Sequence, residues 1–124
     1  MKLQPDRFDT LAINAYGPGW IAVNGQRMEH SLIVSSQGRL ENWNCDGMAS
    51  LSVEHFNRLA DDLPELVVFG SGSRLRFVSP TLLRGLIAKG IGVETMDTKA
   101  ACRTYNILAG EGRKVVAALI IENS

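Results

Sequence analysis

The chain has 124 residues, 45% of them hydrophobic and 21% charged, which is ordinary for one soluble globular domain. Thirteen lysines and arginines balance thirteen aspartates and glutamates, which excludes the excess positive charge that general nucleic-acid binding and polybasic membrane docking require. The two cysteines, Cys45 and Cys102, form no CxxC pair, which argues against a disulfide framework and favours a reducing cytoplasm.

The start of the chain predicts neither a secretory signal nor a transit peptide. Asp6 and Asp9 interrupt the apolar run that a signal peptide needs, and transit peptides are poor in acidic residues. The longest apolar run, 115–121, is far shorter than the roughly 20 residues that cross a bilayer. We therefore expect a bacterial cytoplasmic protein with no stable membrane insertion.

The first part of the chain predicts an antiparallel meander of four strands, at 11–15, 20–23, 28–34 and 40–43. Apolar side chains alternate in the first and third of these stretches, as they do in strands with one buried face. Asn24 and Gly25 give the strongest hairpin signal, because both tolerate the positive φ of a type I′ turn.

The second part of the chain changes to helical periods separated by apolar strands. We expect helices at 52–63, 80–89 and 98–109, and strands at 66–70, 91–95 and 114–121. Ser52, Ser79 and Asp97 are suitable N-cap residues for these helices. Continuous apolar runs such as 66–69 suit central strands buried on both faces, and helical crossovers between them favour parallel pairing.

These elements predict an α/β fold in a single domain, residues 1–124. An N-terminal antiparallel meander would join a C-terminal β-α-β-α-β unit. Residues 1–9 are expected to be flexible.

Five short motifs carry a resemblance to a known family. They are Gly70-Ser71-Gly72, Gly92-Val93-Glu94, Met96-Asp97-Thr98, Thr104-Tyr105-Asn106 and Glu111-Gly112-Arg113. On these motifs the chain resembles a family of small uncharacterised bacterial and archaeal proteins related to mitochondrial NADH:ubiquinone oxidoreductase complex assembly factor 3. The resemblance begins near Ile13 and is strongest at 67–119.

The resemblance implies a three-layer domain with a mixed central sheet, in which the last strand is antiparallel to its neighbours. It also implies no established catalytic activity and no cofactor. A protein partner is expected, as for an assembly factor of respiratory complex I, and the sequence leaves a homo-oligomer open.

The stretch Gly70-Ser71-Gly72-Ser73 is the first candidate site, because it follows a strand and precedes a helix. Its backbone N–H groups are placed to cradle an anion, although Leu75 stands where a dinucleotide-binding loop needs its third glycine. Arg74 and Arg76 would add forked donors to a carboxylate or phosphate. The alternative is a tight turn flanked by solvated arginines, and the sequence leaves both interpretations open.

Met96, Asp97 and Thr98 form the second candidate site, also between a strand and a helix. Open α/β sheets bind ligands where such loops leave the carboxyl edge. We expect this loop to lie beside Gly70–Ser73, with Arg103 at the rim, and to attract phosphate, sulfate or an acidic side chain of a partner. Capping of the helix by Asp97 is the simpler role.

Arg103 and Asn106 are three residues apart and therefore share one face of the last helix. That face predicts either a contact with a ligand or partner or an ordinary solvated surface. Glu94 is expected to form a structural ion pair with Arg103 or Arg113.

Neither catalytic residues nor metal ligands are predicted. Cys102 lies on the apolar stripe of its helix and should be buried and inert, whereas Cys45 should be more exposed in a loop. His30 and His55 lack metal-ligand spacing to one another or to a cysteine.

Two functions remain open from the sequence. The first is a non-catalytic protein-interaction or assembly factor. The second is a small anionic-ligand-binding protein or weak enzyme that uses the Gly70–Gly72 and Met96–Thr98 loops. A deep cleft with convergent polar groups would favour the second function, and an apolar surface would favour the first.

Overall fold

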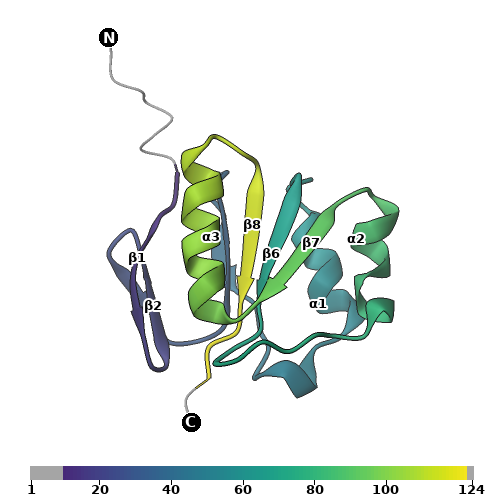
Figure 1. Cartoon of the computed structure of the whole chain (residues 1–124), viewed down its shortest axis with the longest axis horizontal. Helices are drawn as coiled ribbons and strands as arrows, with labels where there is room; N and C mark the ends of the chain where they lie inside the picture. The colour runs from purple at the N-terminus through teal and green to yellow at the C-terminus, as the bar shows by residue number, and fades with distance from the viewer. Residues whose placement is uncertain (1–9, 123–124) are drawn as a thin grey trace.

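The computed structural model describes residues 10–122 and arranges the strands in two sheets (Figure 1). The smaller sheet is antiparallel, with strands β1 (Ile13–Gly17), β2 (Trp20–Val23) and β3 (Gln26–Met28) in that order. The larger sheet has the order β5-β4-β8-β6-β7, with β4 (Leu32–Ser35), β5 (Leu40–Asn42), β6 (Leu66–Gly70), β7 (Gly92–Met96) and β8 (Val115–Leu119). The flexibility expected for residues 1–9 lies outside the described residues.

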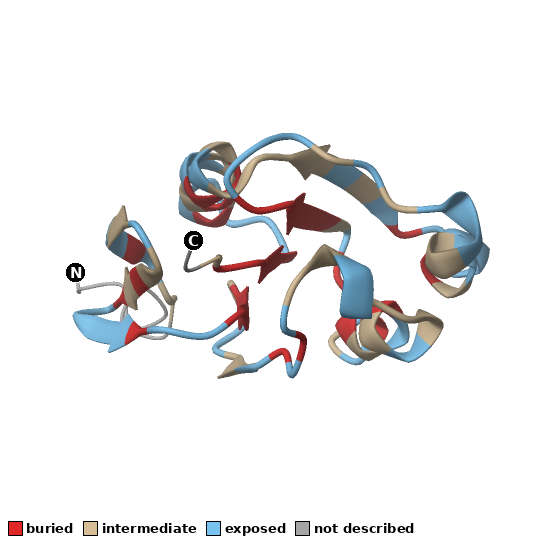
Figure 2. Cartoon of the chain, turned by 90° about the horizontal axis from the view of Figure 1, so that it is seen from below, coloured by how far each residue is buried: buried red, intermediate tan, exposed pale blue. Residues whose placement is uncertain are grey.

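The larger sheet is the middle of three layers (Figure 2). One face packs against α3 (Thr98–Gly110) and the smaller sheet. The other face packs against α1 (Val53–Asn57), α2 (Arg84–Ala88) and neighbouring 3₁₀ turns. The predicted α/β fold with a mixed central sheet and a C-terminal β-α-β-α-β unit is confirmed.

The central strands are apolar throughout because they are buried on both faces. In β6, Val68 faces the core under α3, whereas Val67 and Phe69 face the core under α1 and α2. All three side chains are 0% exposed. A strand that contributes to two cores cannot alternate apolar with polar residues.

The expected pairing of the last strand is wrong on one side. β8 is antiparallel to β4, as the resemblance implied, but it is parallel to β6. β6 is also parallel to β7. The chain returns to the sheet through α3, and such a crossover connects parallel strands.

The predicted meander is wrong at its third strand. The stretch 28–34 divides into β3, which ends at Met28, and β4, which begins at Leu32 in the other sheet. Met28 and Leu32 are both buried in the core under α3, while Glu29 and His30 between them are exposed. The chain therefore passes from one sheet to the other between Met28 and Leu32, although both residues face the same core.

Two predicted helices are shorter than expected. The stretch 52–63 forms α1 and then a 3₁₀ turn, Arg58–Ala60, and Leu63 has a positive φ of 49°. The stretch 80–89 begins as a 3₁₀ turn, Pro80–Leu83, before α2. Short segments held by packing often adopt this tighter geometry.

Two side chains of α3 fix the smaller sheet to the rest of the protein. Asn106 donates from Nδ2 to the Ile13 carbonyl at 2.8 Å and accepts from the Ile13 N–H at 2.9 Å. The Tyr105 hydroxyl donates to the carbonyl of Leu11 at 2.6 Å. The Asn106 amide thus pairs with both backbone groups of one residue, as a neighbouring strand would.

Candidate functional site

The two candidate loops are neighbours, as predicted. Ser71 N–H donates to the Met96 carbonyl at 2.8 Å, and Thr98 N–H donates to the Gly72 carbonyl at 2.9 Å. The Thr98 hydroxyl accepts from Gly72 N–H at 2.9 Å and donates to the Ile120 carbonyl at 2.8 Å. Thr98 therefore ties the loop after β6 to the segment after β8.

Gly70 is required for this close approach. A Cβ atom at Gly70 would lie 3.0 Å from the Thr98 Cα and 3.0 Å from a methyl carbon of Leu119. The Thr98 backbone cannot give way as a flexible side-chain end would. The first glycine of the Gly-Ser-Gly motif thus has a packing role, which is to seat the start of α3 on β6.

The anion beside the Gly70–Ser73 loop is a carboxylate of the chain itself. Glu122 Oε1 accepts from Ser73 N–H at 2.9 Å and from the Ser73 hydroxyl at 3.0 Å. Its other oxygen pairs with the Arg76 guanidinium, which also donates to the Ser71 carbonyl at 2.7 Å. We call the contacts of Glu122 with Ser73 and Arg76 the Glu122 clamp.

The clamp lowers the pKa of Glu122 below its ordinary value of 4.5, mainly through the hydrogen bond from Arg76 and then through the donors of Ser73. The sequence pattern pointed to Arg74 and Arg76 alike and did not point to Glu122. No local pattern indicates Glu122, because it meets Ser73 and Arg76 only through the sheet order.

The remaining predicted site residues have separate positions. Arg74 is exposed, and its guanidinium has no partner within residues 10–122. Asp97 caps α3 by accepting from Ala100 N–H at 2.9 Å. Arg103 is exposed and donates to the Tyr16 hydroxyl at 3.2 Å, whereas both ends of the Asn106 amide bind Ile13. A ligand-binding role for these residues stays a prediction.

The expected ion pair of Glu94 is absent from the described part of the chain. Glu94 is exposed on β7. Arg113 pairs instead with Glu65 at 3.1 Å, because Glu65 and Arg113 lie just before the neighbouring strands β6 and β8. That prediction is wrong.

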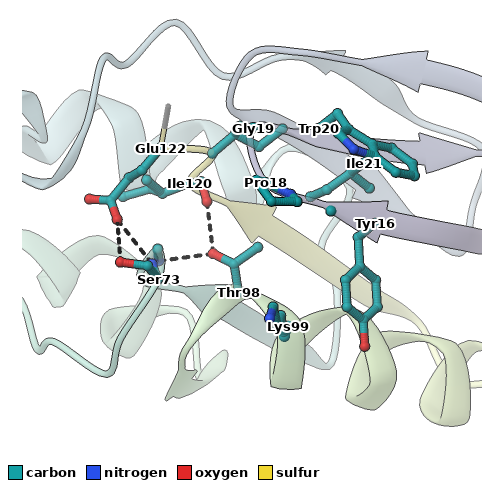
Figure 3. A pocket seen from close by; sticks show the side chains of 13 residues that line it. Tyr16, Pro18, Gly19, Trp20, Ile21, Ser73, Thr98, Lys99, Ile120 and Glu122 are labelled. Atoms are coloured by element: carbon teal, nitrogen blue, oxygen red, sulfur yellow. Dashed lines mark hydrogen bonds between the residues drawn. The ribbon is translucent and has the colours of Figure 1, made fainter. Parts of the chain in front are cut away.

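A pocket of about 210 Å³ lies where the smaller sheet meets these loops (Figure 3). Residues 16–21, from the β1–β2 hairpin, form one wall. The opposite side is formed by residues 72–73, 98–99 and 120–122. Most of the lining is apolar. The hairpin wall could not be predicted, because nothing in residues 16–21 indicates which face they cover.

Three polar side chains at the loop end of the pocket already have hydrogen-bond partners within the chain. Thr98, Ser73 and Glu122 are held by the hydrogen bonds described above, as Figure 3 shows. Lys99 also lines the pocket and has no hydrogen-bond or ion-pair partner within residues 10–122. The pocket therefore offers an apolar surface with one uncommitted positive charge.

Both cysteines are buried. Cys102 is 0% exposed, and burial raises the pKa of its thiol to about 12. Cys45 is 9% exposed, and burial raises its pKa as well, so the expectation of a more exposed Cys45 is wrong. Cys45 is covered because it packs with the core under α1 and α2. Raised thiol pKa values disfavour thiolate chemistry.

We expect native Cys102 to react slowly with thiol reagents and Cys102→Ser to lower the unfolding free energy by about 1–3 kcal/mol, since the new hydroxyl needs a hydrogen-bond partner where the thiol is buried in an apolar core. Labelling a Cys45→Ala variant followed by mass measurement isolates Cys102. Rapid modification of the folded variant would contradict the buried assignment.

We expect Glu122→Gln to lower the unfolding free energy by about 1–3 kcal/mol near neutral pH, because a hydrogen-bonded carboxylate is lost. The folded pKa of Glu122 is depressed, so its contribution is present above the unfolded value of 4.5 and disappears as pH falls below that value through the folded pKa. Urea unfolding across this range measures the effect, with exposed Glu111→Gln as the control. A difference between wild type and Glu122→Gln that does not shrink in acid would contradict the clamp.

Within residues 10–122, no cluster of three or more His, Cys, Asp and Glu side chains is arranged to hold a metal ion. The described helices are also all too short or too polar to cross a bilayer.

Comparison with known proteins places the chain among similar folds and sequences. A crystal structure of a Bordetella parapertussis protein matches with a TM-score of 0.86 and 38% identity, covering 91% of this chain and 97% of that one. An uncharacterized protein of Rhodobacter capsulatus is 31% identical over 94% of this chain and 90% of its own length.

The bovine protein named NADH dehydrogenase [ubiquinone] 1 alpha subcomplex assembly factor 3 is 34% identical over 112 residues, which are 89% of this chain. The match spans 60% of the bovine protein's own length. The resemblance inferred from the five motifs is confirmed, and a family model matches residues 13–120. The chain belongs to the family described as protein of unknown function DUF498/DUF598.

Proposed function

We propose that this chain, folding as a single domain, is a non-catalytic assembly factor of the bacterial cytoplasm that binds a protein partner. The partner we propose is a subunit of a respiratory NADH dehydrogenase, by analogy with the names of the mitochondrial relatives. The bovine relative matches almost the whole described fold, which supports a shared role for this domain.

The pocket between the β1–β2 hairpin and the start of α3 is the observation that carries this proposal. Its lining is mostly apolar, Ser73 and Glu122 are bonded to each other, and the Thr98 hydroxyl is bonded to the backbone of Gly72 and Ile120. Such a surface suits the side chain of a protein partner, because removing apolar surface from water favours binding.

An anionic ligand at the Gly70–Ser73 loop receives less support from the geometry. The Gly72 and Ser73 N–H groups are occupied by Thr98 and Glu122, so a phosphate would have to displace an internal carboxylate that Arg76 also holds. The first function is therefore preferred.

The test is affinity capture of the tagged full-length protein from its own cells, with mass analysis of proteins and small molecules together with native gels of a deletion strain. We expect co-purification of NADH dehydrogenase subunits and accumulation of incomplete complexes without the factor. Unchanged assembly in the deletion strain, with no specific protein captured, would overturn the proposal.

A further inference from the structure

The pocket has room for one bulky side chain. Its volume of about 210 Å³ is below the roughly 300–1,000 Å³ of small-molecule sites. Trp20 and Tyr16 supply aromatic surface from the hairpin, and Ile120 lies across from them (Figure 3). Partly exposed aromatic side chains of this kind are the commonest strong contributors to protein interfaces.

Trp20 is held in place on its other side. The guanidinium carbon of Arg27 lies 4.6 Å from the centre of the Trp20 ring, within cation–π distance. The edge of the indole also lies against Gly17, because a Cβ there would be 2.6 Å from Trp20 Nε1. A side chain fixed in this way loses little conformational entropy when a partner packs on it.

A positively charged edge runs beside the pocket along α3. Lys99 and Arg103 are one helical turn apart on the same face, and both are exposed. Arg103 reaches the pocket wall, since it donates to the Tyr16 hydroxyl at 3.2 Å. Among the ion pairs of residues 10–122, neither Lys99 nor Arg103 has a carboxylate partner.

Glu122 does not neutralise this edge. It is the acidic residue of the pocket lining, but its carboxylate is paired with Arg76 and accepts from Ser73. The local charge beside the pocket is therefore positive although the whole chain is neutral, and local charge selects partners at short range.

We propose that the pocket receives one bulky apolar side chain of a protein partner, and that acidic residues flanking that side chain pair with Lys99 and Arg103. This inference rests on the proposed function, because it names the chemistry of the partner segment. The apolar wall supplies affinity and the basic edge supplies orientation.

The experiment is selection of phage-displayed random peptides on the immobilised full chain. We expect enriched peptides that combine one bulky apolar residue with nearby aspartates or glutamates. Synthetic versions of the enriched peptides that contain no tryptophan are then titrated against the protein. Trp20 fluorescence reports binding for every protein that keeps Trp20, because Trp43 is 0% exposed and contributes a constant background. Titration calorimetry measures the Trp20→Ala variant.

Charge-reversal variants distinguish a local role of Lys99 from the effect of a change in net charge. Lys99→Glu and Trp20→Ala should each weaken the enriched peptides by at least about tenfold. Lys89→Glu is the matched control, since Lys89 is an exposed lysine at the end of α2 and makes the same change in net charge. It should leave affinity within about twofold of wild type. Circular dichroism confirms that each variant is folded.

The inference is overturned if no peptide is enriched, if enriched peptides lack the acidic and apolar combination, or if Lys99→Glu binds them equally well. Binding to anionic phospholipid vesicles that depends on Lys99 and displaces the peptides would assign the edge to a membrane instead, which also overturns it.

Capture from cells distinguishes the docking site from the proposed function. If wild type and Lys99→Glu capture NADH dehydrogenase subunits equally, this docking site is refuted and the assembly role stands. If the wild type captures none, the assembly role is refuted.

Discussion

Replacing Asn106 with alanine is expected to lower the unfolding free energy by about 2–4 kcal/mol and to loosen the smaller sheet before the rest of the fold. The variant removes both hydrogen bonds to Ile13 and leaves a buried residue's N–H and carbonyl unpaired. Alanine has a higher helix propensity than asparagine, so the change in propensity would stabilise the variant. The expected fall in unfolding free energy therefore comes from the lost hydrogen bonds.

Ile107→Ala is the matched control, because Ile107 is the next residue of α3 and is 62% exposed. We expect its effect to stay within about 0.5 kcal/mol. Hydrogen exchange gives the spatial readout: amides of β1 and β2 should lose protection in the Asn106 variant while β6 and β8 keep theirs. Equal loss of protection in all strands would show that Asn106 does not act as the local anchor.

The central sheet could be predicted from the sequence because its signals are local. The expected strands agree with β6, β7 and β8 to within about two residues, since continuous apolar runs between helical periods are typical of strands buried on both faces. For the last strand the crossover favoured parallel pairing and the resemblance implied antiparallel pairing, and β8 is parallel to β6. The resemblance, which implied antiparallel neighbours, was right only for β4.

The third predicted strand shows where local patterns fail. Met28, His30, Leu32 and Val34 follow the period of one strand, but the chain leaves the smaller sheet after Met28 and enters the larger sheet at Leu32. Alternation reports that a residue is buried, and it does not report which sheet buries it. Both Met28 and Leu32 satisfy the pattern by facing one core from two sheets.

The sequence predicts which loops form the candidate site but not their partners, because only the loops have a local signal. The two loops meet because parallel strands bring their carboxyl ends to one edge, which the sequence indicates. Their partners come from far along the chain: Glu122 reaches Ser73, and Arg103 reaches Tyr16. The position of Glu122 leaves no local signature in the sequence, so the neighbouring loops could be predicted and the internal carboxylate that accepts from Ser73 could not.

Replacing Gly72 with alanine is expected to lower the unfolding free energy by about 2–4 kcal/mol by breaking the Glu122 clamp. Gly72 has a φ of +102°, which strains any residue with a Cβ. The added Cβ would also lie 2.7 Å from the Glu122 Cδ and would contact the Arg76 guanidinium. Urea unfolding measures the total loss.

Gly112→Ala separates backbone strain from displacement of the clamp. Gly112 has a φ of +82°, and a Cβ there would meet nothing within 4 Å. Its variant should therefore show only the strain, about 1–2 kcal/mol. In a Glu122→Ala background, Gly72→Ala should cost less than in the wild type, because the carboxylate that it displaces is already gone and only the backbone strain and the contact with Arg76 remain. If Gly72→Ala costs the same with and without Glu122, its effect is backbone strain alone, and the second glycine of the motif does not serve the clamp.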